Sequence, residues 1–163
     1  MIRAIVFDMD GLMLDTEPLA ARAWTDAAIA LGIAFDHAVT ASLVGRNFAD
    51  CRALILAHHG AGYPIDPLMQ AWHVAYDAIV AREGIVLKPG LVELLAWLDG
   101  MGVRKAVATS TRRSRAQAKL ARTALAERFD ALVGGDEPTR GKPAPEIFVL
   151  AATRLGVAAA ECV

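Results

Sequence analysis

Residues 2–11 read IRAIVFDMDG, an apolar run that stops abruptly at two aspartates and a glycine. The run is short and rich in β-branched residues, which is typical of a strand buried in a parallel sheet. Gly11 favours a loop directly after it. Because ligands of open parallel sheets bind beyond the carboxyl ends of the strands, Asp8 and Asp10 lie where chemistry is expected.

A long helical block follows this strand. Apolar residues at helical spacing predict helices over residues 17–32, 48–58 and 66–82. Pro18 falls in the first turn of the first helix, where proline is tolerated. We therefore expect an all-helical subdomain inserted directly after the first strand. Its large aromatic residues are expected in its core, namely Trp24, Trp72 and Tyr76.

Downstream of residue 84 the pattern changes to an alternation of helices and short strands. The predicted elements are a helix beginning at Leu91, a strand at 105–108, a basic helix at 113–128, a strand at 131–133 and a helix at 146–155. Such alternation indicates a Rossmann-like, doubly wound parallel sheet. We predict an α/β fold with a catalytic core of residues 1–16 and 85–163 and a helical cap of residues 17–84.

Composition excludes several classes of protein. The 163 residues carry 17 basic and 18 acidic side chains, which leaves no electrostatic footprint for nucleic acid or an anionic membrane. The cysteines, Cys51 and Cys162, show neither metal-ligand spacing nor a disulfide framework. No leader resembles a signal peptide, and no stretch approaches the roughly 20 apolar residues of a membrane span. We expect a cytoplasmic protein, whose oligomeric state stays open.

Polar residues follow three of the predicted strands and should meet at one edge of the sheet. They are Asp8 and Asp10, then Thr109–Ser110, and Lys142 in a loop after the third strand. This set suits phosphoryl transfer. A carboxylate can attack phosphorus, and a second carboxyl group can protonate the leaving oxygen and then activate water. A lysine and a hydroxyl can hold the phosphate, and Mg²⁺ is the usual bridging metal.

These residues stand in motifs that resemble a known family. Residues 7–17 (FDMDGLMLDTE) closely resemble the first motif of the haloacid dehalogenase superfamily. The resemblance is closest to the helical-cap branch that includes beta-phosphoglucomutase and sugar-phosphate phosphatases. Residues 106–110 (AVATS) and 141–148 (GKPAPEIF) resemble its second and third motifs. The order and spacing match, and the resemblance covers the whole chain.

The resemblance implies a role for each matching residue. Asp8 is then the nucleophile and a metal ligand. Asp10 is the general acid and base, and its backbone carbonyl contacts the Mg²⁺ ion. The other implied contacts are phosphate binding by Thr109, Ser110 and Lys142, and substrate contacts from the cap loop by Arg46 and Asn47. Hinges for cap closure are implied at Asp15–Thr16 and at 84–88.

The sequence departs from the family pattern at its end. The resemblance places a fourth motif after Glu161–Val163, with an acidic pair that completes the metal site, and no such pair is present. It therefore implies a fragment with a sheet that is incomplete at the C-terminus, whether a truncated chain or a natural one. The first strand is then expected to be an exposed edge. We expect weak Mg²⁺ binding and little or no turnover from these residues alone.

Several functions stay open, and they differ in what the sequence favours. The leading hypothesis is a phosphatase for a small phosphorylated metabolite, such as a sugar or polyol phosphate. The mutases of the branch carry a histidine where Ala20 stands and an arginine where Phe48 stands, so hydrolysis is favoured over the alternative of a phosphomutase. Asp10 argues against dehalogenation. A phosphorylated signalling receiver is disfavoured by the insertion at 17–84, and a non-catalytic remnant remains possible.

Overall fold

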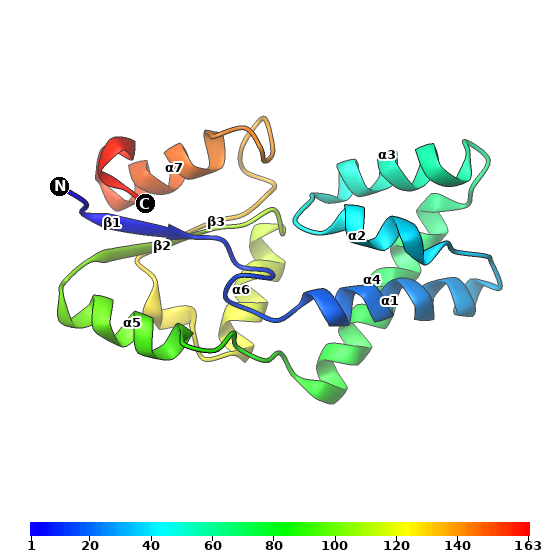
Figure 1. The fold of residues 1–163 in the computed structure, drawn as a ribbon, viewed down its shortest axis with the longest axis horizontal. Coiled ribbons are helices and arrows are strands. Elements are labelled where there is room, and N and C mark those ends of the chain that lie inside the picture. The colour runs from blue at the N-terminus through cyan, green and yellow to red at the C-terminus, as the bar shows by residue number, and fades with distance from the viewer. The chain divides into compact units, whose positions relative to one another are not determined.

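The computed structural model describes residues 1–163 and divides into two compact units. The core unit comprises Met1–Asp15 and Ile85–Val163, and the helical unit comprises Thr16–Gly84. All three strands lie in the core unit, whereas the helical unit has none (Figure 1). The fold is therefore α/β, with a helical insertion between the first and second strands, as the sequence predicted.

A parallel sheet forms the centre of the core unit. Its order is β1-β2-β3, with β1 at Ala4–Phe7, β2 at Arg104–Ala108 and β3 at Ala131–Val133. The helices of this unit are α5 (Leu91–Gly100), α6 (Arg113–Arg122) and α7 (Glu146–Leu155). Helix α7 covers one face of the sheet, and α5 and α6 cover the other (Figure 1). Both faces are therefore buried, as expected for a parallel sheet.

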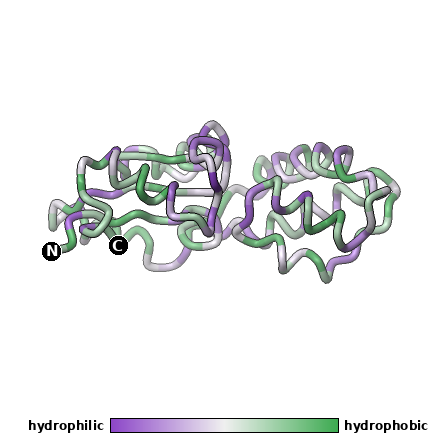
Figure 2. Tube along the Cα trace, turned by 90° about the horizontal axis from the view of Figure 1, so that it is seen from above, coloured by the Kyte–Doolittle hydropathy of each residue, from purple (hydrophilic) through white to green (hydrophobic).

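Alternate residues of the strands serve the two apolar layers. Phe7 and Val107 pack with Leu95 of α5 on one face. Ala106 packs with Ile147 of α7 on the other. This two-sided burial explains why the strands read as continuous apolar runs rather than as alternating patterns. Along the chain as a whole, polar and apolar stretches alternate at short intervals in both units (Figure 2).

The outer edge of β1 is partly covered, which corrects the prediction of an exposed edge. After η3 (Ala159–Glu161) the last residues run alongside β1. The Val6 amide donates to the Val163 carbonyl at 2.7 Å, and the Val163 amide donates to Ala4 at 3.1 Å. The sequence did not reveal this pairing because the segment is too short to show a strand pattern.

Helix α6 is shorter than the predicted basic helix at 113–128. It ends at Arg122, and a separate turn, η2, follows at Ala126–Arg128. Ala124 adopts a positive φ of 57°, which breaks the helix. The Ala124 amide then donates to the Ala121 carbonyl at 3.2 Å and the Leu125 amide to the Leu120 carbonyl at 2.8 Å, which closes the end of the helix. The break turns Leu125 into the apolar core.

The helical unit contains the three predicted helices and two short additions. Its elements are α1 (Glu17–Leu31), η1 (His37–Val39), α2 (Thr40–Leu43), α3 (Phe48–His59) and α4 (Ile65–Glu83). Single turns such as η1 and α2 are too short to show helical periodicity. Trp24, Trp72 and Tyr76 are buried as predicted, and the rings of Trp24 and Trp72 lie 5.3 Å apart. No helix in the chain combines the length and apolarity needed to cross a bilayer.

The two connections between the units pair with each other on the core side. The Asp15 amide donates to the Val86 carbonyl at 2.8 Å, and the Lys88 amide donates to Met13 at 2.9 Å. The Lys88 ammonium also lies 2.7 Å from an Asp15 carboxylate oxygen. These bonds fix residues 86–88 to the core unit. Hinge motion at Asp15–Thr16 and at 84–88 stays a prediction.

Glu137 ties the loop after β3 to the helices on both sides of it. Arg154 of α7 donates to its carboxylate, the Gly134 amide donates at 2.7 Å, and Arg113 of α6 donates at 3.3 Å. These bonds, the one from Arg154 above all, lower the pKa of Glu137 from 4.5 to about 2. The carboxylate form is therefore stabilised by folding.

This lowered pKa predicts an acid-labile contribution to stability. The contribution is fully present above about pH 4.5, the unfolded value, and is lost as the pH falls toward 2. Glu137→Gln is expected to lower the free energy of unfolding by about 2 kcal/mol at pH 7 and by much less at pH 3. Urea unfolding at both pH values measures this. Glu93→Gln, at an exposed carboxylate of α5, is the control, and an equal loss from Glu137→Gln at both pH values would contradict the prediction.

Candidate active site

The loops after the three strands bring the predicted phosphoryl-transfer residues to one edge of the sheet. Asp8 follows β1, Thr109 follows β2, and Lys142 lies between β3 and α7. The Lys142 ammonium is 2.8 Å from Asp8 Oδ1 and 3.0 Å from the Ala108 carbonyl oxygen. It also lies 5.0 Å from the centre of the Phe148 ring. A lysine that is distant in sequence thus joins the ends of β1 and β2.

Asp8 is positioned by the tight loop that follows β1. The Met9 amide donates to Asp8 Oδ1 at 2.8 Å. Met9 and Met13 are fully buried, and the Met13 amide closes a turn onto the Met9 carbonyl at 3.0 Å. The apolar side chains therefore anchor the loop, while Asp8 keeps 38% of its side chain exposed. A nucleophile needs this combination of a fixed backbone and an accessible oxygen.

Thr109 is almost completely buried at the end of β2. Its amide donates to the Val133 carbonyl at 3.1 Å, and its hydroxyl accepts from the Thr111 amide at 3.1 Å. A hydroxyl that accepts in this way still has its own proton to donate. Ser110 follows Thr109 directly and is half-buried. Phosphate binding by Thr109 and Ser110 stays a prediction.

Two glycines allow the end of β3 to lie against this loop. A Cβ added to Gly135 would lie 2.1 Å from the Ser110 carbonyl oxygen, and one added to Gly134 would lie 2.3 Å from the Arg113 amide nitrogen. The Gly135 amide also donates to the Thr111 carbonyl at 2.8 Å. The loop after β2 is thus braced by backbone that approaches too closely for any side chain.

Asp10 has partners of its own, which the sequence analysis did not assign. The Lys119 ammonium lies 2.6 Å from Asp10 Oδ1, and the Thr111 hydroxyl donates to Oδ2 at 2.7 Å. Lys119 belongs to α6, where Ala116 and Leu120 are buried. The basic composition of this helix suggests a solvated face. The spacing of Lys119 from the apolar Ala116 and Leu120 was the one sign in the sequence that this lysine lies beside the core.

Arg46 and Asn47 lie in the helical unit and make local contacts. Asn47 caps α3, since its side-chain oxygen accepts from the Asp50 amide at 2.9 Å. Arg46 donates to the Ser42 carbonyl at 2.8 Å. The capping bond accounts for the residue type at position 47. A substrate contact from either residue stays a prediction.

The oxygen ligands present are too few for a complete magnesium site. The Asp8 carboxylate and the Asp10 backbone carbonyl are the kind of ligand that Mg²⁺ takes. However, no group of three or more His, Cys, Asp or Glu side chains in the chain could hold a metal ion. The donor set of the 163 residues therefore does not fit a full site.

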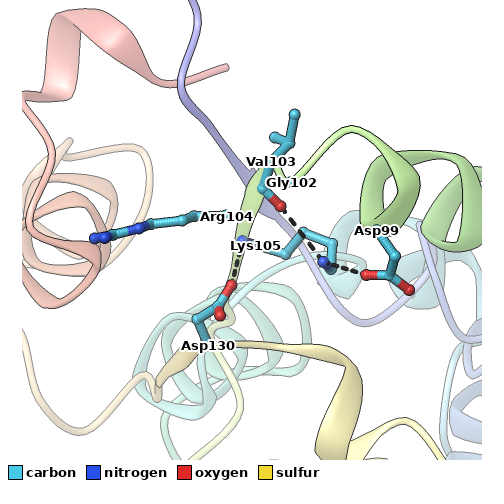
Figure 3. A pocket seen from close by; sticks show the side chains of 6 residues that line it. All are labelled: Asp99, Gly102, Val103, Arg104, Lys105 and Asp130. Atoms are coloured by element: carbon cyan, nitrogen blue, oxygen red, sulfur yellow. Dashed lines mark hydrogen bonds and ion pairs between the residues drawn. The ribbon is translucent and has the colours of Figure 1, made fainter.

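A hollow of about 210 Å³ lies at the opposite edge of the sheet, at the amino end of β2 (Figure 3). Here the Lys105 amide donates to Asp130 at 2.7 Å, and the Lys105 ammonium lies 2.5 Å from Asp99 Oδ1. Hydrogen bonds from Lys105 and Arg128 lower the pKa of Asp99. Arg104, which also lines the hollow, donates to the Leu155 carbonyl. The charged groups here therefore bond to one another or to the backbone, which is typical of a structural network.

The fold and this strand-end arrangement define a class of protein. The chain matches the haloacid dehalogenase-like hydrolase family over residues 2–163, and it belongs to that family. The fold of a core with a helical insertion is shared by solved structures of the family. The crystal structure of CbbY from Rhodobacter sphaeroides in complex with phosphate has a TM-score of 0.82 and 31% identity, covering 100% of this chain and 76% of that one.

Two curated relatives show the range of activities around the chain. The fructose-1-phosphate phosphatase YqaB of Escherichia coli is 33% identical, and the match covers 98% of this chain and 83% of that protein. The beta-phosphoglucomutase of Bacillus subtilis is 30% identical, over 99% of this chain and 73% of that protein. The chain is thus related both to a sugar-phosphate phosphatase and to a mutase.

Proposed function

We propose that this protein is a phosphatase that hydrolyses a small phosphorylated metabolite through an aspartyl-phosphate on Asp8. The observation that carries the proposal is the contact of Lys142 with both Asp8 and the end of β2. This contact supports the proposal because a cation beside the Asp8 carboxylate could neutralise charge on a phosphoryl group that bonds to Asp8. The names of the two relatives support a sugar phosphate as the substrate, and a polyol phosphate is the chemically similar alternative.

The first step transfers the phosphoryl group to the protein. An Asp8 oxygen forms a bond to phosphorus while the bond from phosphorus to the ester oxygen breaks. The Asp10 carboxyl gives its proton to the leaving alkoxide, so that an alcohol departs. Lys142 neutralises charge on the phosphoryl oxygens, and the Thr109 hydroxyl donates a hydrogen bond to one of them.

The second step returns the protein to its starting state. The Asp10 carboxylate takes a proton from water as the water oxygen attacks phosphorus. The bond from phosphorus to Asp8 breaks and inorganic phosphate leaves. The first step uses the proton that Asp10 carries and the second step restores it, so one carboxyl group serves as acid and then as base.

Two positions in the helical unit favour water over a sugar hydroxyl as the acceptor. Ala20 offers a methyl group where a mutase histidine would stand, and it cannot move a proton. Phe48 stacks on His73 with ring centres 4.5 Å apart, and it carries no charge to hold a second phosphate. Transfer of the phosphoryl group back to a sugar therefore lacks both the histidine and the arginine that the resemblance to mutases would imply.

A screen of phosphate esters tests the proposal. The protein expressed from its whole gene is incubated with sugar phosphates, polyol phosphates and Mg²⁺, with Asp8→Asn as the control. We expect release of inorganic phosphate from at least one ester and none from the variant. Isomerised sugar phosphate without phosphate release would identify the mutase instead, and no reaction with any ester would refute both.

For the 163-residue chain alone we expect weak Mg²⁺ binding, with a dissociation constant above about 1 mM, because the ligand set is incomplete. Turnover should be slight or absent for the same reason. Isothermal titration with Mg²⁺, compared between the chain and Asp8→Asn, measures the first expectation. A clear Mg²⁺-dependent hydrolysis of a phosphate ester by this chain would contradict the second.

A further inference from the structure

Both carboxylate oxygens of Asp10 bind side chains that have no role in the two proposed reaction steps. The Lys119 ammonium lies 2.6 Å from Oδ1 and the Thr111 hydroxyl 2.7 Å from Oδ2. The side chain of Lys119 is only 13% exposed and that of Asp10 26%. Ion pairs on an open surface have little effect on geometry, but a pair this sheltered, with a donor on each oxygen, restricts how the carboxyl group turns.

Both donors are themselves held in place. Lys119 lies on α6 next to the buried Leu120, so its stem can pack along the apolar layer while its ammonium reaches Asp10. Thr111 accepts from the Gly135 amide at 2.8 Å and donates its own amide to Thr109 at 3.1 Å. The orientation of Asp10 is thereby coupled to the loop that carries Thr109.

We propose that Lys119, together with Thr111, is a positioning residue that orients the Asp10 carboxyl group for proton transfer to the leaving oxygen. This inference rests on the proposed function. A general acid must lie within hydrogen-bond reach of the oxygen it protonates, and a freely rotating carboxyl meets that condition only part of the time. The two bonds use two of the roughly four acceptor sites of a carboxylate, so they do not by themselves block its proton.

The two lysines at this edge then have separate tasks. Lys142 contacts Asp8 and would contact the phosphoryl group, whereas Lys119 contacts Asp10. Loss of Lys119 should therefore impair protonation of the leaving group more than it impairs phosphate binding. For an ester whose leaving group departs without a proton, the loss of Lys119 should change the rate of hydrolysis very little.

The test compares two esters in the protein expressed from its whole gene. Lys119→Met keeps the length of the stem and removes the ammonium. We expect kcat/KM to fall about 30-fold for a sugar phosphate that the wild type hydrolyses and less than about 3-fold for p-nitrophenyl phosphate. Lys119→Arg should restore part of the loss. The matched control is Lys105→Met, which removes a buried ammonium paired with the exposed Asp99 at the opposite edge and should show no such selectivity.

Several results would overturn the inference. These are an equal loss on both esters, the same selectivity in Lys105→Met, or crystal structures in which Asp10 keeps its orientation in Lys119→Met. If the wild type hydrolyses no ester, the proposed function fails. The comparison of crystal structures then still decides whether Lys119 orients Asp10, because it does not depend on turnover.

Discussion

Asp8→Asn is expected to lower kcat for phosphate-ester hydrolysis at least about a thousandfold in the protein expressed from its whole gene. The amide oxygen can still accept the hydrogen bond from Met9, so the loop after β1 should keep its conformation. An amide is a far weaker nucleophile than a carboxylate, so the covalent step is lost. Steady-state phosphate release, together with trapping of a phosphorylated protein at acid pH, measures both aspects.

Asp99→Asn provides a matched control for this variant. Asp99 also faces a lysine ammonium, that of Lys105 at 2.5 Å, and its side chain is 45% exposed against 38% for Asp8. It lies in the last turn of α5 near the amino end of β2, away from the strand-end cluster, so we expect less than about a threefold change in kcat. Phosphorylated protein from Asp8→Asn, or equal losses in the two variants, would show that Asp8 is not the nucleophile.

Gly135→Ala is expected to have the second-largest effect. The new Cβ would lie 2.1 Å from the Ser110 carbonyl oxygen, and both groups belong to backbone that cannot simply rotate away. The loop carrying Thr109 and Ser110 must therefore shift. We expect a loss of about 1–3 kcal/mol in the free energy of unfolding and a fall of about 100-fold in kcat/KM.

Thermal unfolding and kinetics of the same preparation separate these two effects. Gly100→Ala is the control, because no atom lies within 4 Å of its added Cβ and the residue ends α5. It should leave kcat/KM unchanged and alter stability only slightly. Wild-type activity in a folded Gly135→Ala variant would show that the close approach of these loops does not position the candidate site.

Much of the fold could be predicted from local pattern. The strand at 131–133 and the helix at 146–155 have the predicted bounds, because a short apolar run and apolar spacing at 3.6 residues are local properties. The early end of α6 could not be predicted from local pattern. Ala124 adopts a positive φ there, Leu125 is buried as a result, and the stabilisation from that burial depends on the tertiary core. The single-turn elements η1 and α2 carry too few residues to show any period.

The candidate site divides in the same way. Asp8, Asp10, Thr109, Ser110 and Lys142 were predicted because each follows a strand or stands in a motif. Lys119 was not, because it lies within a helix whose composition resembles a solvated face, and only the packing of α6 carries it to Asp10. The cover that Val163 provides for β1 was missed for a related reason, since pairing partners distant in sequence leave no local mark.

The sequence by itself therefore determined the α/β class, the helical insertion and the strand-end residues that suit phosphoryl transfer. These follow from periodicity and from chemistry that is written residue by residue. The tertiary structure alone decided which cation serves which carboxylate, with Lys142 at Asp8 and Lys119 at Asp10. The physical reason is that an ion pair depends on a distance of a few ångströms across separate elements, and that distance exists only after the helices and loops have packed on the sheet.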